Sequence, residues 1–178
     1  MGDRNRAWEF ADFIDRTFPH AGRIADVAGG HGELSYWLQE LGHSPVVIEP
    51  RDVRLPRWIH RDLRKRAVRE GHLARIERIV APVEAVDLRG FSLVVGLHPD
   101  QATEPAVRAA VAYDLDFAVV PCCVFPMDGR TYTAQGWLEH LATLAPGSRI
   151  ARLPISGANA VVWRRRSTPW TGGRLVSW

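Results

Sequence analysis

Cysteine, lysine and long apolar segments are all scarce in this sequence of 178 residues. Its two cysteines are adjacent, Cys122 and Cys123. Neighbouring residues on a strand point to opposite faces, so we expect no ordinary disulfide between them, and reduced thiols fit a cytosolic compartment. No apolar run reaches the roughly 20 residues that span a bilayer, and the N-terminus lacks the apolar core of a signal peptide. We therefore expect a cytoplasmic protein without a membrane partner.

The length and composition predict one globular domain over residues 1–178. Nearly half of the residues are hydrophobic and a quarter are charged, as is typical of a folded domain. An amphipathic N-terminal helix is expected within residues 1–20, and an irregular tail over 165–178, where Trp170 and Trp178 could anchor the chain. Arginine carries nearly all of the positive charge, because Lys65 is the only lysine.

Apolar periodicity predicts strands that alternate with helices. The expected helices cover residues 7–18, 33–41, 62–70, 102–113 and 134–144, and the expected strands cover 24–28, 45–49, 75–80, 92–97, 117–122, 150–153 and 160–163. Helical crossovers make the first five strands parallel, and the last strand is expected antiparallel beside the fifth. Ligands of such sheets bind beyond the carboxyl ends of the strands.

The segment after the first strand has the composition of a nucleotide-binding turn. Asp26 closes an apolar run, a glycine-rich turn follows, and Glu49 ends the second strand 23 residues later. In dinucleotide-binding proteins the turn reads G-x-G-x-x-G and seats a pyrophosphate. Here the third glycine is replaced by Ser35. A carboxylate just before the turn would repel a pyrophosphate but suits a cationic or zwitterionic ligand, and Glu49 suits ribose hydroxyls.

The run from Asp26 to Gly32 resembles motif I of the class I S-adenosylmethionine (SAM) methyltransferases. The resemblance implies a Rossmann-like, seven-stranded, mostly parallel sheet with an antiparallel last strand and helices on both faces. It also implies SAM as the cofactor, because SAM carries an ammonium and a sulfonium but no phosphate. The residues then expected to bind SAM are Asp26, Ala28, Gly29, Gly30, Gly32, Glu49, Pro50, Arg51, Ala81, Pro82, Val83, Gly96 and Leu97.

Two later segments, Leu97-His98-Pro99-Asp100 and Pro121-Cys122-Cys123, resemble a methyltransferase subgroup that includes transfer-RNA 2′-O-methyltransferases. The resemblance covers residues 24–125 in order. His98 and Asp100 are the candidate catalytic residues, since a base near neutral pKa can deprotonate a methyl acceptor. His98 could instead shape the pocket through a hydrogen bond to the backbone, and Asp100 could cap the helix that begins near residue 102.

The role of the cysteines stays open between packing, lining of the acceptor pocket and metal binding. With His98 they would offer three ligands, one fewer than a structural zinc site needs, so no metal is expected. The arginine-rich segment 51–78 fits either an RNA-binding surface or a solvated helix face, because acids are interspersed among its arginines.

The sequence thus predicts a SAM-dependent methyltransferase whose acceptor is RNA or a small molecule. Two alternatives remain: a catalytically silent SAM-binding module that acts through a partner, and an NAD-dependent oxidoreductase. The acceptor atom and the oligomeric state are not predicted.

Overall fold

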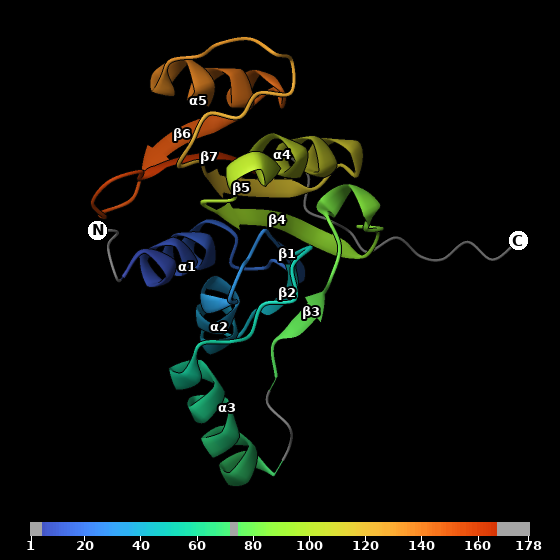
Figure 1. Cartoon of the computed structure of the whole chain (residues 1–178), viewed down its shortest axis with the longest axis vertical. Coiled ribbons are helices and arrows are strands. Elements are labelled where there is room, and N and C mark those ends of the chain that lie inside the picture. The colour runs from blue at the N-terminus through green and yellow to red at the C-terminus, as the bar shows by residue number, and fades with distance from the viewer. Residues whose placement is uncertain (1–4, 72–74, 167–178) are drawn as a thin grey trace, which may run out of the picture.

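A computed structural model describes residues 5–71 and 75–166 of the chain (Figure 1). The strands are β1 (Arg23–Val27), β2 (Ser44–Ile48), β3 (Glu77–Ile79), β4 (Phe91–Leu97), β5 (Asp116–Val120), β6 (Arg149–Arg152) and β7 (Ala160–Arg164). The helices are α1 (Arg6–Thr17), α2 (Glu33–Glu40), α3 (Arg57–Glu70), α4 (Thr103–Ala112) and α5 (Ala134–Thr143), with short 3₁₀ turns η1 (Val83–Ala85) and η2 (Asp100–Ala102). The predicted tail and its Trp170 and Trp178 lie outside the described residues.

The strands form one seven-stranded sheet in the order β3-β2-β1-β4-β5-β7-β6. Strands β1 to β5 are parallel, while β7 lies antiparallel to both β5 and β6. The prediction of a parallel block closed by an antiparallel last strand beside the fifth is confirmed. Because β1 lies between β2 and β4, the strand order reverses there, and the carboxyl ends of these three strands meet at one edge.

The inner strands β1, β4, β5 and β7 bury residues on both faces of the sheet under helices, whereas the edge strands β3 and β6 remain partly exposed. On one face, Ile24 and Leu93 pack in a core with Phe10 of α1 and Leu38 of α2. On the other face, strand residues such as Val94 pack in a core with the apolar sides of α4 and α5. Alternation along the strands explains both cores, since neighbouring side chains point to opposite faces. The predicted placement of helices on both faces is confirmed (Figure 1).

Helix α3 begins at Arg57, five residues before the expected start at residue 62. Pro56 precedes its first turn with an extended backbone, and Ile59 and Leu63, one turn apart, are buried against Tyr36 of α2. The prediction of a shorter helix over residues 62–70 left Ile59 and its contact with α2 out. Further along, α3 extends away from the sheet (Figure 1), and Val68 is 87% exposed.

The fifth strand ends at Val120, so the expectation that it continues to residue 122 is wrong. Pro121 follows directly, and proline cannot donate a hydrogen bond to the sheet. Cys122 and Cys123 therefore lie in the following loop, where their sulfur atoms are 3.5 Å apart. The argument that a strand would point them to opposite faces fails, although both cysteines are free.

Within the described part of the chain, no helix has the length and apolar character needed to cross a bilayer.

Candidate functional site

A cavity of about 400 Å³ lies at the edge where the carboxyl ends of β1, β2 and β4 meet. Its size is that of a small-molecule site. The lining residues are the last residues of β1 and β2 together with residues of the segments that follow β1 to β4: Val27, Ala28, Ile48, Glu49, Pro50, Arg51, Pro82, Val83, Glu84, His98, Pro99, Asp100, Gln101, Ala102 and Pro105. The topology thus places the cavity at the point where the strand order reverses.

The glycine turn between β1 and α2 requires glycine for two different reasons. Gly30 and Gly32 adopt positive φ angles of 49° and 82°, which favour glycine. Gly29 is needed for space, because a Cβ atom there would lie 2.6 Å from a carboxylate oxygen of Asp26. A Cβ at Gly30 would meet no atom nearer than the carbonyl oxygen of Ala28 at 4.0 Å.

Glu49 supplies the principal anionic group of the cavity. Its side chain is 1% exposed and accepts hydrogen bonds from the Gly30 backbone N–H at 3.2 Å and from Arg51 Nε at 2.7 Å. Burial alone would raise the pKa of Glu49, but the hydrogen bonds from Arg51 and Gly30 outweigh burial and keep the pKa below its usual value. Glu49 is therefore an ionised acceptor at neutral pH.

Asp26 lies beneath the glycine turn and does not line the cavity. It is fully buried and accepts a 2.7 Å hydrogen bond from the hydroxyl of Ser35, the first-turn residue of α2 that replaces the third glycine. Burial raises the pKa of Asp26 to about 7, against the lowering effect of the Ser35 hydrogen bond. The structure therefore places the Asp26 carboxylate in contact with the hydroxyl and the backbone of Ser35, although the sequence predicts Asp26 to be among the SAM-binding residues.

Three residues with left-handed backbone conformations line the cavity although none is glycine. Ala28, His98 and Asp100 have φ angles of 51°, 55° and 48°. Such conformations cost on the order of 1–3 kcal/mol and persist only where the surrounding structure enforces them. Asp114, two residues after the end of α4, is the only other such residue that is not glycine in the described ranges. This strain points to the cavity as a functional site.

His98 lines the cavity and also contacts the loop between β6 and β7. Its Nε2 lies 3.1 Å from the carbonyl oxygen of Ala158, so the neutral ring must donate there and keep its lone pair on Nδ1. Burial lowers the pKa of His98, which leaves the ring neutral at pH 7. A neutral ring with a free Nδ1 lone pair can accept a proton.

Asp100 does not cap α4 with its side chain, contrary to the alternative considered from the sequence. The helix begins at Thr103 after the 3₁₀ turn η2, and no side-chain cap is formed. The Asp100 carboxylate instead accepts a hydrogen bond from Cys122 Sγ at 3.0 Å. Burial is the main cause that raises the pKa of the Cys122 thiol to about 12, and the hydrogen bond to Asp100 is the second cause.

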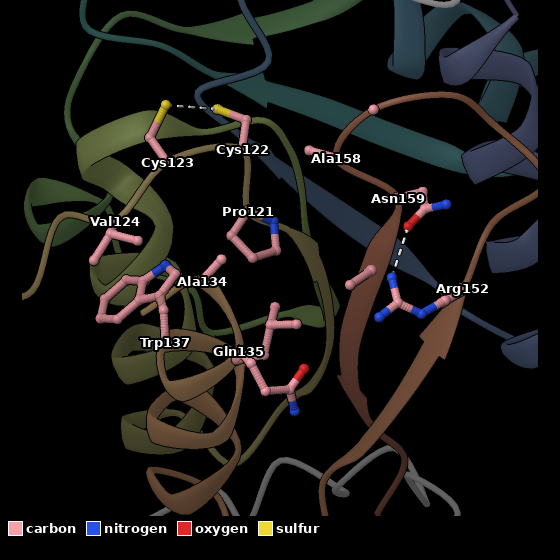
Figure 2. A pocket seen from close by; sticks show the side chains of 13 residues that line it. Pro121, Cys122, Cys123, Val124, Ala134, Gln135, Trp137, Arg152, Ala158 and Asn159 are labelled. Carbon is pink, nitrogen blue, oxygen red and sulfur yellow. Dashed lines mark hydrogen bonds between the residues drawn. The ribbon is translucent and has the colours of Figure 1, made fainter. Parts of the chain in front are cut away.

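A second cavity of about 320 Å³ adjoins this point (Figure 2). It lies between the loop after β5, the start of α5 and the β6–β7 loop, and it is lined by Pro121, Cys122, Cys123, Val124, Ala134, Gln135, Trp137, Leu138, Arg152, Gly157, Ala158, Asn159 and Ala160. The two cavities are linked by contacts, because Asp100 of the first bonds Cys122 of the second and His98 bonds Ala158.

The structure brings together part of the residue set expected from the sequence. Lining the first cavity are Ala28, Glu49, Pro50, Arg51, Pro82, Val83, His98 and Asp100; not lining it are Asp26, Gly29, Gly30, Gly32, Ala81, Gly96 and Leu97. Gly96 supports the wall, since a Cβ there would lie 3.1 Å from Pro99 Cγ. Leu97 packs in the core with α1 and α2, and Ala81 packs against the opposite core.

Sequence reasoning missed the contribution of η2 and the residues after it. Pro99, Gln101, Ala102 and Pro105 line the cavity because the left-handed turns at His98 and Asp100 fold this segment over the end of β4. The two prolines that flank the segment were the available signal for an irregular connection.

The arginine-rich segment divides into paired and exposed side chains. Arg66 bonds Asp62 and the hydroxyl of Tyr36, whereas Arg57, Arg61 and Arg64 are exposed along α3. Trp58, the one aromatic residue of this segment, is 39% exposed and packs against Tyr36 and Trp37 with ring centroids 5.0 and 6.0 Å away. The exposed arginines form a cationic helix face with little aromatic surface for base stacking.

No protein-family model and no curated protein matches this chain. Solved structures share its fold. A sugar N-methyltransferase, KedS8, from Streptoalloteichus sp. ATCC 53650 is 17% identical with a TM-score of 0.55, over 92% of this chain and 88% of that chain. The 1,6-didemethyltoxoflavin N1-methyltransferase of Burkholderia thailandensis, solved with S-adenosylhomocysteine, is 20% identical with a TM-score of 0.54, over 90% and 77%.

The tRNA (uracil-54, C5)-methyltransferase of Pyrococcus abyssi, also solved with S-adenosylhomocysteine, is 14% identical with a TM-score of 0.56. The match covers 89% of this chain but 37% of that enzyme. The predicted Rossmann-like class I methyltransferase fold is confirmed by these likenesses and by the strand order.

Proposed function

We propose that this chain is a SAM-dependent methyltransferase. The observation that carries the proposal is the buried, ionised Glu49 at the end of β2, which receives the N–H of the glycine turn inside a cavity of suitable size. An ionised carboxylate is the acceptor that the two ribose hydroxyls of SAM require. The similar folds of methyltransferases solved with S-adenosylhomocysteine support the same cofactor.

In this proposal Glu49 binds the ribose, and Arg51 must turn away from Glu49 when the ribose enters. The Arg51 side chain is 72% exposed, so this movement costs little packing. Ala28, which precedes the glycines of the turn and lines the cavity, contacts the methionine part, while Pro50, Pro82 and Val83 contact the adenine. Asp26 keeps the turn in place from below. The cofactor supplies the methyl group, and the protein supplies position and orientation.

We further propose that the methyl acceptor occupies the second cavity, with His98 at its junction with the cofactor. The Nδ1 lone pair of His98 is the candidate base for an oxygen or nitrogen acceptor. A volume of about 320 Å³ suits a small molecule. The cationic face of α3 favours a second candidate acceptor, an RNA whose target nucleotide enters the cavity while arginines contact its phosphates.

Binding and turnover experiments separate this proposal from its alternatives. Calorimetric titration with SAM and with NAD⁺ tests the cofactor, and NAD⁺ binding without SAM binding would support an oxidoreductase. Transfer of a labelled methyl group into a metabolite extract and into total RNA tests the acceptor. SAM binding with no labelled product in either pool would support a catalytically silent module.

A further inference from the structure

The cluster formed by Asp100, Cys122 and Cys123 has a geometry that packing alone does not require. A ligand atom from each of the three residues lies within 4.8 Å of the other two. The Cys122 and Cys123 sulfur atoms are 3.5 Å apart, and Cys122 Sγ lies 3.0 Å from Asp100 Oδ1. His98, which the sequence suggested as the third ligand, bonds Ala158 instead, so Asp100 takes its place.

We propose that Asp100, Cys122 and Cys123 bind one thiophilic divalent cation, with Zn²⁺ as the reference ion. Two thiolates bound at about 2.3 Å to one tetrahedral zinc lie roughly 3.8 Å apart, close to the separation found here. A carboxylate oxygen binds zinc at about 2.0–2.2 Å, so small side-chain rotations complete three of four tetrahedral positions. Thiolate ligands favour Zn²⁺ over Mg²⁺ or Ca²⁺.

The loop after β5 exposes the cluster to an entering ion. Cys123 is exposed and Cys122 is half-buried, and Figure 2 shows both sulfur atoms at one end of the second cavity. Cys122 presently donates its thiol hydrogen to Asp100, and a cation would take the place of that hydrogen between the same two atoms. The three ligand atoms already lie within 4.8 Å of one another.

The position of the cluster defines what a bound cation would do. Asp100 lines the first cavity and the two cysteines line the second, so the ion would sit at the junction of the two. Three protein ligands leave one tetrahedral position for water or substrate, as in catalytic zinc sites. A role for that position in binding the heteroatom of a methyl acceptor rests on the proposed function, whereas cation binding itself does not.

Titration of the fully reduced chain with Co²⁺ and Zn²⁺, in the absence of SAM, tests the proposal. Cobalt bound by thiolates gives a sulfur-to-metal charge-transfer band, and its visible bands report tetrahedral geometry. We expect one cobalt per chain with both signals, and displacement of cobalt by Zn²⁺. Cys122→Ser and Cys123→Ser should each weaken the band, and Asp100→Asn should lower affinity roughly tenfold or more.

Asp87→Asn is the matched control, because Asp87 is an exposed carboxylate paired with Arg89 away from both cavities. It should leave cobalt affinity and both signals unchanged. The proposal is overturned if the reduced wild-type chain shows no charge-transfer band at stoichiometric cobalt, or if Asp100→Asn binds cobalt as tightly as wild type. Calorimetric SAM binding on the same samples reports separately on the proposed function.

Discussion

At the scale of single residues, Gly29 is the position in the glycine turn with the least space for a side chain. A Cβ there would lie 2.6 Å from Asp26 Oδ2, inside the separation that unbonded atoms tolerate. We expect Gly29→Ala to lower the free energy of unfolding by about 1–3 kcal/mol and to abolish detectable SAM binding, because the turn must shift. Gly22→Ala is the control, since its Cβ would meet Ser92 at an ordinary 3.6 Å. Urea unfolding and calorimetry measure both effects, and equal losses in the two variants would contradict the placement.

Asp26 makes stability depend on pH in a direction opposite to that of most acids. Its folded pKa of about 7 lies above its ordinary value of 3.8, so the folded state holds the proton more tightly than the unfolded state. Its contribution is therefore greatest below pH 4 and declines as pH rises to about 7.

Asp26→Asn keeps the shape of the side chain and removes this titration. We expect the stability of the variant, relative to wild type, to rise between pH 4 and pH 7 by on the order of 1–4 kcal/mol and then to level off. Urea unfolding at several pH values measures the difference. A difference that stays constant across this range would show that Asp26 does not titrate as described.

Substitutions at Glu49 and at Arg51 are expected to have opposite effects on the affinity for SAM. Glu49→Gln should weaken SAM binding by about 1–3 kcal/mol, because the charged acceptor for the ribose is lost. Arg51→Ala should leave affinity unchanged or increase it, because Arg51 competes for the same carboxylate in the structure without ligand. Calorimetry on both variants tests the pair, and a weaker affinity only in Arg51→Ala would exclude Glu49 as the ribose-binding acid.

At the scale of elements, the loop after β5 is fastened to α4 by a buried carboxylate. Glu104 is fully buried, accepts the Met127 backbone N–H at 2.8 Å and bonds Arg108 Nε at 2.7 Å. We expect Glu104→Ala to destabilise the chain by about 2–5 kcal/mol, since the Met127 and Arg108 donors lose their partner. Glu139→Ala, at an exposed position on α5, should change stability by less than about 0.5 kcal/mol. Urea unfolding compares the two, and similar losses would contradict the anchoring role.

Element type was predictable because periodicity is strong, whereas element ends depended on tertiary contacts. The apolar residues of β1, β4 and β5 alternate between two cores, and that alternation is visible in the sequence. The early start of α3 depends on the burial of Ile59 and Leu63 against α2, which only the fold reveals. The end of β5 at Val120 was signalled by Pro121, but the apolar run through the cysteines concealed it.

At the scale of the whole molecule, the position of the cavity at the carboxyl ends of the strands could be predicted from the expected strand order. The full set of residues that line the cavity could not be predicted. Glu49, Pro82 and His98 could be placed there because each comes at or just after a strand end. The burial of Asp26 could not be predicted, because the same acid-then-glycine spacing fits a carboxylate above or below the turn. The hydrogen bond between Asp100 and Cys122 joins two residues that are 22 positions apart in the sequence, and only the structure reveals it.

The two acceptor classes differ in their dependence on the cationic face of α3. For an RNA acceptor, Arg57→Ala, Arg61→Ala and Arg64→Ala together should reduce methyl transfer and lessen its salt dependence, because phosphate contacts are lost. For a small-molecule acceptor, the triple variant should retain wild-type transfer. Labelled methyl transfer at two salt concentrations decides between them, and unchanged RNA methylation in the variant would exclude this face as the RNA contact.

Calorimetric titration of the chain with SAM and, separately, with NAD⁺ tests the central claim most directly. The account predicts one SAM site per chain, a weaker one in Glu49→Gln, and no heat of binding for NAD⁺. Saturable NAD⁺ binding with no SAM binding would contradict it.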